Sequence, residues 1–331
     1  MSKKKTKRQS RYHGVVVVDK PEGLTSQDVV GVIRRAAGTR RVGHTGTLDP
    51  LATGLLLILV GEATKLSEYM VGFDKTYEGT MRLGVESDTY DCQGEIKDGP
   101  GGEIPSLEKL RELTEPFTGE IEQVPPPYSA VKVKGKKLYE YARAGEKVDA
   151  KARRVKVSSY EILSMEGDIA TFRVACASGT YVRSLVHELG QAAGCGALVQ
   201  SLRRTETADF TLEEAVSLET FQDMAPDAVG PYLLPIVDTL TDWPIYVLEK
   251  SAETWIERGQ AIPAALAHHE GSSETGRIGD LVFLVKLSGA AVAVAKVVPA
   301  PPSPPPAQLA RHAGLWFQPV KLMQTSENTE K

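Results

Sequence analysis

Apolar runs and helical spacing define the first elements of the chain. The stretches 15–21 and 55–61 each begin with a run of Val, Leu or Ile residues, which predicts two short buried strands. Between them, residues 25–38 carry apolar side chains at the spacing of one helix face, namely Val29, Val32, Ile33 and Ala36. Ser26 is predicted to cap the start of this helix, and Gly38 its end.

Strands and helices continue along the chain without a repeating strand–helix–strand order. The patterns predict strands at 75–84, 153–163 and 168–179, helices at 106–117 and 180–194, and a rigid loop, hairpin and short helix at 124–145. Since neighbouring strands are joined as hairpins, the predicted fold class is α+β. It contains a mixed, mostly antiparallel β-sheet with flanking helices.

The pattern changes after about residue 240. A strand, a short helix and a turn at 243–263, then two or three strands at 276–298, predict a small β-rich domain. The proline-rich tract 299–308 is interpreted as an extended spacer, with a ligand for another domain as the alternative. The predicted organisation is a basic disordered tail at 1–11, a main domain at 12–240 and a small domain at 241–325.

Composition excludes several classes of protein. Hydrophobic residues at 41% and charged residues at 25% are ordinary globular values, which argue against a disordered or fibrous chain. The spacing of Cys92, Cys176 and Cys195 gives neither a disulfide framework nor a CxxC metal site. The basic start is followed by only four valines, too few for a signal peptide or a membrane span. We therefore expect a cytoplasmic protein with no metal and no membrane partner.

Charge is unevenly distributed along the chain. The net charge is −4, but residues 1–11 carry six Lys or Arg and no acid. Residues 132–156 carry ten Lys or Arg against three acids, which leaves the remainder of the chain at −17. This segregation predicts a polyanion-binding stripe on an acidic body, because counterion release needs only local positive charge. A solvated hairpin and a disordered tail are the alternative.

A glycine- and proline-rich segment at 40–54 has no apolar period and is predicted to be an irregular loop. Asp49 lies within it, directly before a proline, where few neighbours can cover its carboxylate. By itself Asp49 could equally be an Asx-turn residue or a helix cap. A phosphate-binding loop is disfavoured, because GHTGTLDP lacks the Lys-Ser/Thr of a P-loop and precedes a strand.

The same segment resembles the TruB-type tRNA pseudouridine synthases, most specifically in GHTGTLDPLATGLLLILVGEATK at 43–65. Further family-like segments follow in order: DKPEGLTS (19–26), KTYEGTMRLG (75–84), PPPYSAVKVKGKKLYEYAR (125–143), CASGTYVRSL (176–185) and LRRT (202–205). The resemblance covers residues 12–216, and the last segment is similar to a PUA-type RNA-binding domain. It implies a bacterial stand-alone isomerase that converts uridine 55 in the T arm of tRNA.

The resemblance also implies roles for individual residues. Asp49 would be the essential carboxylate, either as a nucleophile at the ribose or as the base that removes its 2′ proton, and Arg183 would pair with it. Tyr77 would lie against the target uracil, and Leu202 would close the other face of the pocket. From pattern alone, Arg183 would be an exposed helix residue and Tyr77 a cross-strand packing residue.

RNA-binding roles follow from the same resemblance. His44 would fill the space that the flipped nucleotide leaves, and Lys20 would support the Asp49 loop. Tyr181 is also predicted to contact the substrate. A basic, aromatic thumb at about 125–156 would follow the phosphates of the T arm through Lys132, Lys134, Lys136 and Lys137.

The implied isomerisation moves no electrons or groups in or out of the substrate, so no cofactor is expected. Two other classes of function compete with it. A noncatalytic RNA-binding module is disfavoured by the joint presence of Asp49, Tyr77 and Arg183. A glycoside hydrolase usually needs a second carboxylate, which the signature loop does not supply. With no sign of oligomerisation in the sequence, a monomer is expected.

Overall fold

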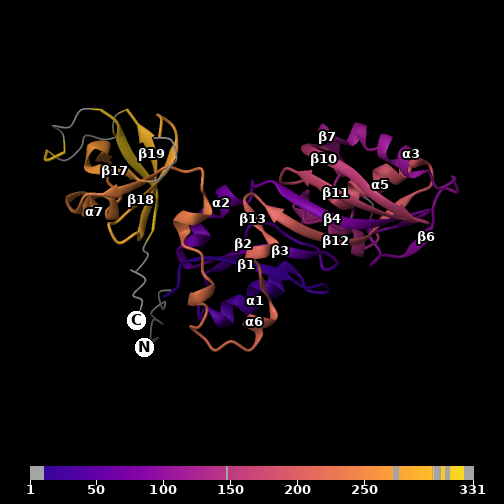
Figure 1. The fold of residues 1–331 in the computed structure, drawn as a ribbon, viewed down its shortest axis with the longest axis horizontal. Helices are drawn as coiled ribbons and strands as arrows, with labels where there is room; N and C mark the ends of the chain where they lie inside the picture. The colour runs from indigo at the N-terminus through magenta and orange to yellow at the C-terminus, as the bar shows by residue number, and fades with distance from the viewer. Residues whose placement is uncertain are drawn as a thin grey trace.

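The computed structural model describes residues 11–146, 148–270, 276–299, 301, 307–309 and 314–323. A large sheet with flanking helices occupies the centre and one end of the molecule, and a smaller sheet forms the other end (Figure 1). Residues 1–10 of the predicted tail, and most of the proline-rich tract, lie outside the described residues.

Ten strands form the large sheet. They are β1 (Gly14–Lys20), β2 (Val42–His44), β3 (Thr53–Val60), β4 (Lys75–Leu83), β7 (Gly119–Gln123), β10 (Arg153–Glu166), β11 (Ile169–Cys176), β12 (Ala197–Thr207), β13 (Phe210–Thr211) and β14 (Val216–Ser217). Their order is β14-β1-β3-β12-β4-β11-β10-β7, with β2 on β3 and β13 on β12. Only the β1–β14 and β12–β3 pairs are parallel, which confirms the predicted mixed, mostly antiparallel sheet.

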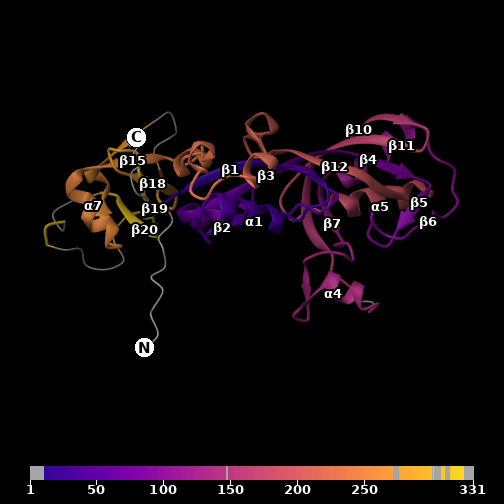
Figure 2. The ribbon, with the colours of Figure 1, turned by 90° about the horizontal axis from the view of Figure 1, so that it is seen from below.

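Short helices and hairpins surround this sheet. The helices are α1 (Ser26–Ala36), α2 (Ser67–Met70), α3 (Leu107–Glu112), α4 (Leu138–Arg143), α5 (Val182–Ala193) and α6 (Glu219–Gln222), with a 3-10 turn η1 (Gly61–Leu66) before α2. Two small hairpins pair β5 (Val85–Ser87) with β6 (Ile96–Asp98), and β8 (Lys132–Val133) with β9 (Lys136–Lys137). Figure 2 shows α4 projecting away from the body of the molecule, as the predicted thumb requires.

Strands β1 and β3 are buried on both faces, which explains why their sequences are continuous apolar runs. Val16, Leu56 and Ile58 pack in a core shared with α1. Their neighbours Leu55 and Leu57 belong to a second core that includes residues of the C-terminal sheet. The α+β class thus arises around two cores that share the same pair of strands.

Strand β12 connects the two halves of the large sheet and was not predicted as a strand. It pairs along its length with β4 and touches β3 only at Arg203–Thr53 and Arg204–Gly54. Bulges interrupt its register with β4 between Val199 and Ser201 and between Arg204 and Glu206. Its charged and polar residues interrupt the alternation of apolar and polar positions from which the other strands were predicted.

The predicted start of the first helix is wrong, and so is the predicted extent of the loop that follows this helix. Thr25, not Ser26, caps α1, because its side chain accepts a hydrogen bond from the Asp28 amide in a capping box. The helix ends at Ala36, and Gly38 terminates it as predicted: it has a φ of +58°, and its amide donates to the Arg35 carbonyl at 3.1 Å. The predicted loop 40–54 also contains β2, a strand of three residues that is too short to show a period but pairs with β3.

The C-terminal sheet contains six strands: β15 (Ile245–Leu248), β16 (Ile262–Pro263), β17 (Ala267–Glu270), β18 (Leu281–Val285), β19 (Ala291–Val298) and β20 (Trp316–Leu322). Helix α7 (Lys250–Glu257) packs against it through Ala252 and Ile256. The result confirms the small β-rich domain and is consistent with a PUA-like fold. No helix in the described residues is long and apolar enough to span a membrane.

Candidate active site

The loop that carries Asp49 is tied to the elements on either side of it. The Ser26 hydroxyl accepts a hydrogen bond from the Leu48 amide at 2.8 Å and donates to the Leu48 carbonyl at 3.1 Å. The buried Lys20 ammonium donates to the carbonyls of Leu24 at 2.7 Å and Pro50 at 3.5 Å. Because both neighbours of Asp49 are held, its carboxylate is presented in a defined position with 39% of the side chain exposed.

Arg183 lies directly against Asp49. Its Nε and Nη2 atoms both lie 2.8 Å from Oδ2 of Asp49. Arg183 is in the first turn of α5 but only 5% of its side chain is exposed, so the pattern-based expectation of an exposed helix arginine is wrong. The pair joins residues 134 positions apart in the chain.

The remaining donors of Arg183 are also occupied. Nη1 donates to the Thr89 carbonyl at 2.7 Å, and Nη2 donates to the Tyr128 carbonyl at 3.0 Å. Nη1 also lies 3.5 Å from Oδ2 of Asp91, a carboxylate with 6% of its side chain exposed. Sequence analysis did not identify Asp91, because nothing in its acidic loop separates a buried carboxylate from a solvated one.

Tyr77 and Leu202 lie on one face of the large sheet, on neighbouring strands. Tyr77 on β4 is the register partner of Arg204 on β12, and Leu202 is the partner of Gly79. A side chain at Gly79 would meet the Ser201 carbonyl at 2.4 Å, so glycine permits this close approach. Tyr77 and Leu202 are each 8% exposed, and burial raises the pKa of the Tyr77 hydroxyl.

The charge of Asp49 reaches three of the other predicted site residues. Burial lowers the pKa of Lys20 to about 8, although the Asp49 carboxylate acts in the opposite direction. Burial, followed by the Asp49 charge among other contributions, raises the pKa of Tyr181. Tyr77 also experiences the Asp49 charge. Arg183 thus contacts the Asp49 carboxylate directly, and Lys20, Tyr77 and Tyr181 lie near enough to experience its charge.

His44 enters the same region from β2. Burial, and then the positive charge of Arg204, lowers its pKa, so the imidazole is neutral near pH 7. Its Nδ1 atom is buried without a hydrogen-bond partner. Tyr181 precedes the first residue of α5 instead of lying within the predicted helix, and its backbone forms two hydrogen bonds with the Gln123 side chain.

The four predicted thumb lysines fall into two groups. Lys132 and Lys134 are exposed. Lys136 and Lys137 are half-buried, and their ammonium groups lie 4.4 Å and 5.3 Å from the ring centres of Tyr141 and Tyr139. The first pair is free to meet phosphates, whereas the second pair also holds α4 against the β8–β9 hairpin.

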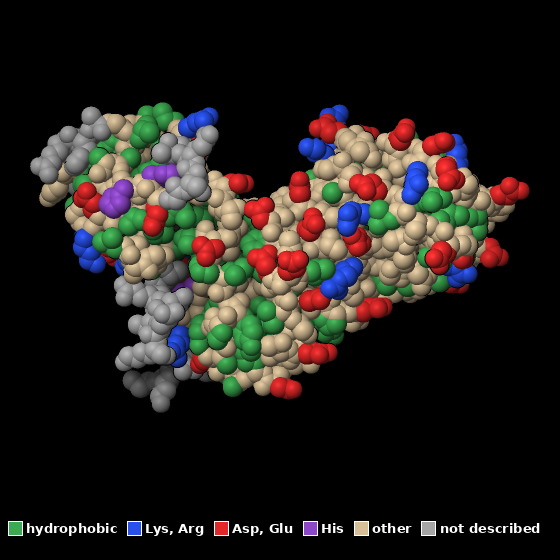
Figure 3. All heavy atoms as spheres, viewed as in Figure 1, with side chains coloured by type: hydrophobic (Ala, Val, Ile, Leu, Met, Phe, Trp, Pro, Cys, Tyr) green, Lys and Arg blue, Asp and Glu red, His purple; other side chains and the backbone are tan. Residues whose placement is uncertain are grey.

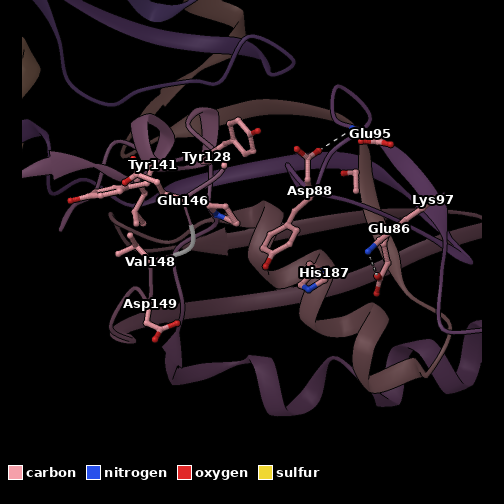
Figure 4. Close-up of a pocket in the computed structure, with 16 residues that line it drawn as sticks. Glu86, Asp88, Glu95, Lys97, Tyr128, Tyr141, Glu146, Val148, Asp149 and His187 are labelled. Atoms are coloured by element: carbon pink, nitrogen blue, oxygen red, sulfur yellow. Dashed lines mark hydrogen bonds and ion pairs between the residues drawn. The ribbon is translucent and has the colours of Figure 1, made fainter.

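A cavity of about 760 Å³ lies between the thumb and the β5–β6 hairpin (Figure 4). Five carboxylates line it, from Glu86, Asp88, Glu95, Glu146 and Asp149, against one lysine, Lys97. Neither Asp49 nor Tyr77 lines it. The excess of carboxylates gives this cavity a negative charge, which would repel phosphate groups.

Acidic and basic side chains both lie on the face of the body that Figure 3 shows. Carboxylates are spread over the central and right-hand parts of the face in Figure 3. Within the described residues, no group of three or more His, Cys, Asp or Glu side chains is arranged to hold a metal ion. The groups in the site that can take part in chemistry are thus the accessible Asp49 carboxylate, the buried Arg183 guanidinium that contacts it, and the nearby Tyr77 hydroxyl.

Comparisons with known proteins place this geometry in a family. The family described as "TruB family pseudouridylate synthase (N terminal domain)" matches residues 34–182, and "tRNA pseudouridylate synthase B C-terminal domain" matches residues 183–240. The tRNA pseudouridine synthase B of Pseudomonas aeruginosa is 42% identical over 276 residues, which cover 80% of this chain and 89% of that protein. The corresponding protein of Stutzerimonas stutzeri is 43% identical over 263 residues, 78% of this chain and 86% of that one.

Solved structures agree with this assignment. A structure of an H/ACA RNP bound to a substrate RNA containing 2′-deoxyuridine matches with a TM-score of 0.66 and 26% identity, over 94% of this chain and 86% of that chain. A Cbf5-Nop10-Gar1 complex matches with a TM-score of 0.65 and 28% identity, over 94% and 85%. Both matches extend through the C-terminal sheet.

Proposed function

Since the chain belongs to the TruB family of pseudouridylate synthases and its activity is tRNA pseudouridylation, we propose that its target is uridine 55 in the T arm. The observation that carries this proposal is the Asp49–Arg183 pair in the GHTGTLDP loop. The carboxylate is accessible to a substrate, while the arginine is buried and cannot turn away.

Asp49 starts the reaction in this proposal. Its carboxylate either adds to ribose C1′ or removes the 2′ proton, and both routes break the bond between C1′ and N1 of the base. The detached uracil turns and C5 bonds to C1′, which breaks the Asp49–C1′ bond in the first route and returns the proton to C2′ in the second. The C5 proton then leaves, and N1 gains a proton. Both routes need an ionised carboxylate, which the Arg183 guanidinium stabilises and orients.

Tyr77 and Leu202 would hold the uracil during its rotation. The Tyr77 ring stacks on one face of the base, and its hydroxyl assists proton transfer at C5. Leu202 covers the other face. No electron or external group is needed, so the proposed reaction requires no cofactor.

The target base must leave the RNA stack before it can reach Asp49. Flipping costs a few kcal/mol in lost stacking, and a neutral, planar His44 would recover part of that energy in the vacated space. Tyr181 and the thumb lysines would contact the surrounding RNA. We further propose that residues 12–240 form the catalytic domain, that residues 241–325 bind RNA, and that the protein acts as a cytoplasmic monomer.

A tritium-release assay tests the proposed function. Purified protein is incubated with a tRNA transcript labelled at C5 of uracil, and pseudouridine is mapped by chemical modification and primer extension. We expect release of tritium and a single modified position at 55. The Asp49→Asn variant should bind the transcript but retain less than about a hundredth of the activity, because an amide is neither nucleophile nor base.

A transcript with cytidine at position 55 is the matched substrate control and should release no tritium. Binding without release would identify a noncatalytic RNA-binding protein, and free uracil would identify a hydrolase. Deuterium at the ribose 2′ carbon separates the two routes. A primary isotope effect would favour proton removal by Asp49, and its absence would favour nucleophilic addition.

A further inference from the structure

Arg204 is a buried cation to which the proposed mechanism gives no role. It is 2% exposed and is among the largest fully buried side chains of the described chain. Within the described residues, no carboxylate forms an ion pair with it, and the hydrogen bonds of its side chain go to the backbone carbonyls of Leu55 and Gly46. Burying a guanidinium without a counter-charge is costly, so its position calls for a compensating function.

The contacts of Arg204 connect three parts of the candidate site. Its Nε donates to the Leu55 carbonyl at 2.6 Å, at the start of β3. Its Nη2 donates to the Gly46 carbonyl at 3.3 Å, in the loop that leads to Asp49. Across the sheet, Arg204 is the register partner of Tyr77, and its positive charge acts on the Tyr77 hydroxyl.

The backbone of Arg204 packs closely against β3. Gly54 is the partner of Arg204 on β3, and a Cβ atom there would lie 2.2 Å from the Arg204 carbonyl. Gly54 also has a φ of +97°, which an L side chain rarely adopts. The strand that carries Arg204 is therefore pressed directly against the end of the Asp49 loop.

The positive charge of Arg204 acts on several site residues. Burial raises the pKa of the Tyr77 hydroxyl, and Arg204 is the strongest influence in the opposite direction. After burial, the Arg204 charge is the next cause that lowers the pKa of His44 and of Lys75, the latter to about 8. Arg204 thus favours a neutral His44 and a Tyr77 hydroxyl that releases its proton more readily.

We propose that Arg204 is a positioning residue of the uridine pocket: its guanidinium is bonded to the backbone on both sides of the Asp49 loop and lies on the strand position opposite Tyr77, so it sets the position of Tyr77 relative to that loop and acts on the reaction through Tyr77. This inference rests on the proposed function, because it assumes that Tyr77 works at the base while Asp49 works at the ribose. A lysine cannot reproduce the arrangement, since a single ammonium lacks the planar fork whose separate nitrogens bond the Gly46 and Leu55 carbonyls.

A double-mutant cycle tests the proposal. Single-turnover rates at saturating tRNA and dissociation constants are measured for wild type, Arg204→Lys, Tyr77→Phe and the double variant. We expect Arg204→Lys to lower the rate at least about tenfold while changing the dissociation constant less than about threefold. In the Tyr77→Phe background, the same substitution should lower the rate less than about twofold further, because its effect passes through the missing hydroxyl.

Arg203→Lys is the matched control, on the same strand and one residue away. Arg203 has 41% of its side chain exposed and pairs with Asp19 at 2.7 Å, a contact that lysine can retain. Its rate should stay within about threefold of wild type. An unchanged rate for Arg204→Lys, or losses that simply multiply in the double variant, would overturn the positioning role.

A second measurement covers the case in which Arg204→Lys does not fold. In wild-type protein labelled with ¹⁵N-arginine, the Nε–H of Arg204 should exchange slowly with water, and its resonance should shift in Tyr77→Phe. Fast exchange, or a resonance that does not respond to Tyr77→Phe, would contradict the proposal. A wild-type protein that forms no pseudouridine would instead contradict the proposed function, and the NMR result would remain interpretable on its own.

Discussion

Arg183 shows how an ordinary helix residue becomes part of a site through its surroundings. Its guanidinium contacts the Asp49 carboxylate, the carbonyls of Thr89 and Tyr128, and the buried Asp91 carboxylate. These partners come from separate loops, so the position of each donor is fixed independently. A planar group with several donors satisfies this geometry, whereas a single ammonium does not.

We therefore expect Arg183→Lys to lower turnover at least about a hundredfold, because lysine keeps the positive charge but lacks the planar guanidinium whose several N–H groups bond Asp49 and its neighbours. RNA affinity should change little, since only 5% of the Arg183 side chain is exposed. Single-turnover kinetics and a filter-binding assay separate the two effects. Arg173→Lys is the control: Arg173 is an exposed residue paired with Glu78 on β4, and a near-normal rate is expected for it.

Lys20 predicts a dependence of stability on pH. Burial lowers its pKa from 10.5 to about 8 in the folded protein. Between these pH values the unfolded chain holds the proton and the folded chain does not, so the contribution of Lys20 to stability increases as pH rises. The unfolding free energy of wild type, minus that of Lys20→Met, should increase between pH 7.5 and 9.5 by up to about 1.4 kcal/mol per pH unit.

Urea unfolding at three pH values measures this difference. Lys75, whose pKa is also lowered to about 8 by burial, is present in both proteins, so its effect cancels. A difference that stays constant over the range would mean that Lys20 keeps its proton in the folded state.

At the scale of elements, the thumb combines a binding surface with its own internal support. The β8–β9 hairpin and α4 are held together by Lys136 and Lys137 over tyrosine rings and by the Tyr141 hydroxyl, which donates to the Val133 carbonyl at 3.1 Å. Lys136 also lies 3.6 Å from Glu146. The four lysines that the sequence placed in one stripe are thus expected to behave differently.

Replacing Lys132 and Lys134 together with alanine should lower the magnitude of the slope of log K against log salt by about 0.7 to 0.9 per lysine. The same change at Lys136 and Lys137 should weaken binding with a smaller change in slope, because part of the loss is a disordered α4. Binding titrations over a range of salt concentrations compare the two pairs. Lys109→Ala on α3, an exposed lysine paired with Glu112, should leave the slope unchanged. Equal slopes for all variants would place the RNA elsewhere.

At the scale of the whole molecule, the two sheets share a hydrophobic core. Residues of β1, β3, η1 and α2 pack with Phe283 and Val294 of the C-terminal sheet and with Met323, which directly follows its strand β20. At the border, Lys321 pairs with Glu68 at 2.6 Å, and Lys65 donates to the Leu322 carbonyl. Burial of this apolar surface couples the stability of the C-terminal sheet to the strands that flank the Asp49 loop.

Phe283→Ala tests this coupling. Phe283 is fully buried in the shared core, so the substitution should lower the unfolding free energy by about 3 to 5 kcal/mol. Pseudouridine formation should then fail at a lower temperature, together with the loss of tertiary structure. Ile278→Ala, at a side chain that is 61% exposed, should change neither the unfolding free energy nor the temperature at which activity is lost. Activity that outlasts the unfolding of the C-terminal sheet would show that the two parts are independent.

The local pattern of apolar and polar residues was sufficient to predict much of the secondary structure of this protein. The apolar runs of β1 and β3 and the alternation in β4, β10 and β11 follow directly from which faces must be buried, so these strands and the α+β class were predictable. The motif around Asp49, and its resemblance to a family, predicted the residues that the fold brings together around the carboxylate.

Only the tertiary structure decided the remaining features, namely strand β12, the role of Ser26 and the burial of several charged residues. The burial of a residue, and the partners of its charge, depend on elements that are distant in the chain. Strand β12 has no clear alternation and becomes a strand only between β3 and β4. Ser26 is a tether for Leu48 instead of a helix cap because the loop folds back over it. Arg183, Asp91 and Arg204 look like solvated residues in the sequence, but the fold buries them. Once they are buried, water no longer screens their charges, and their partners are set by the shape of the site.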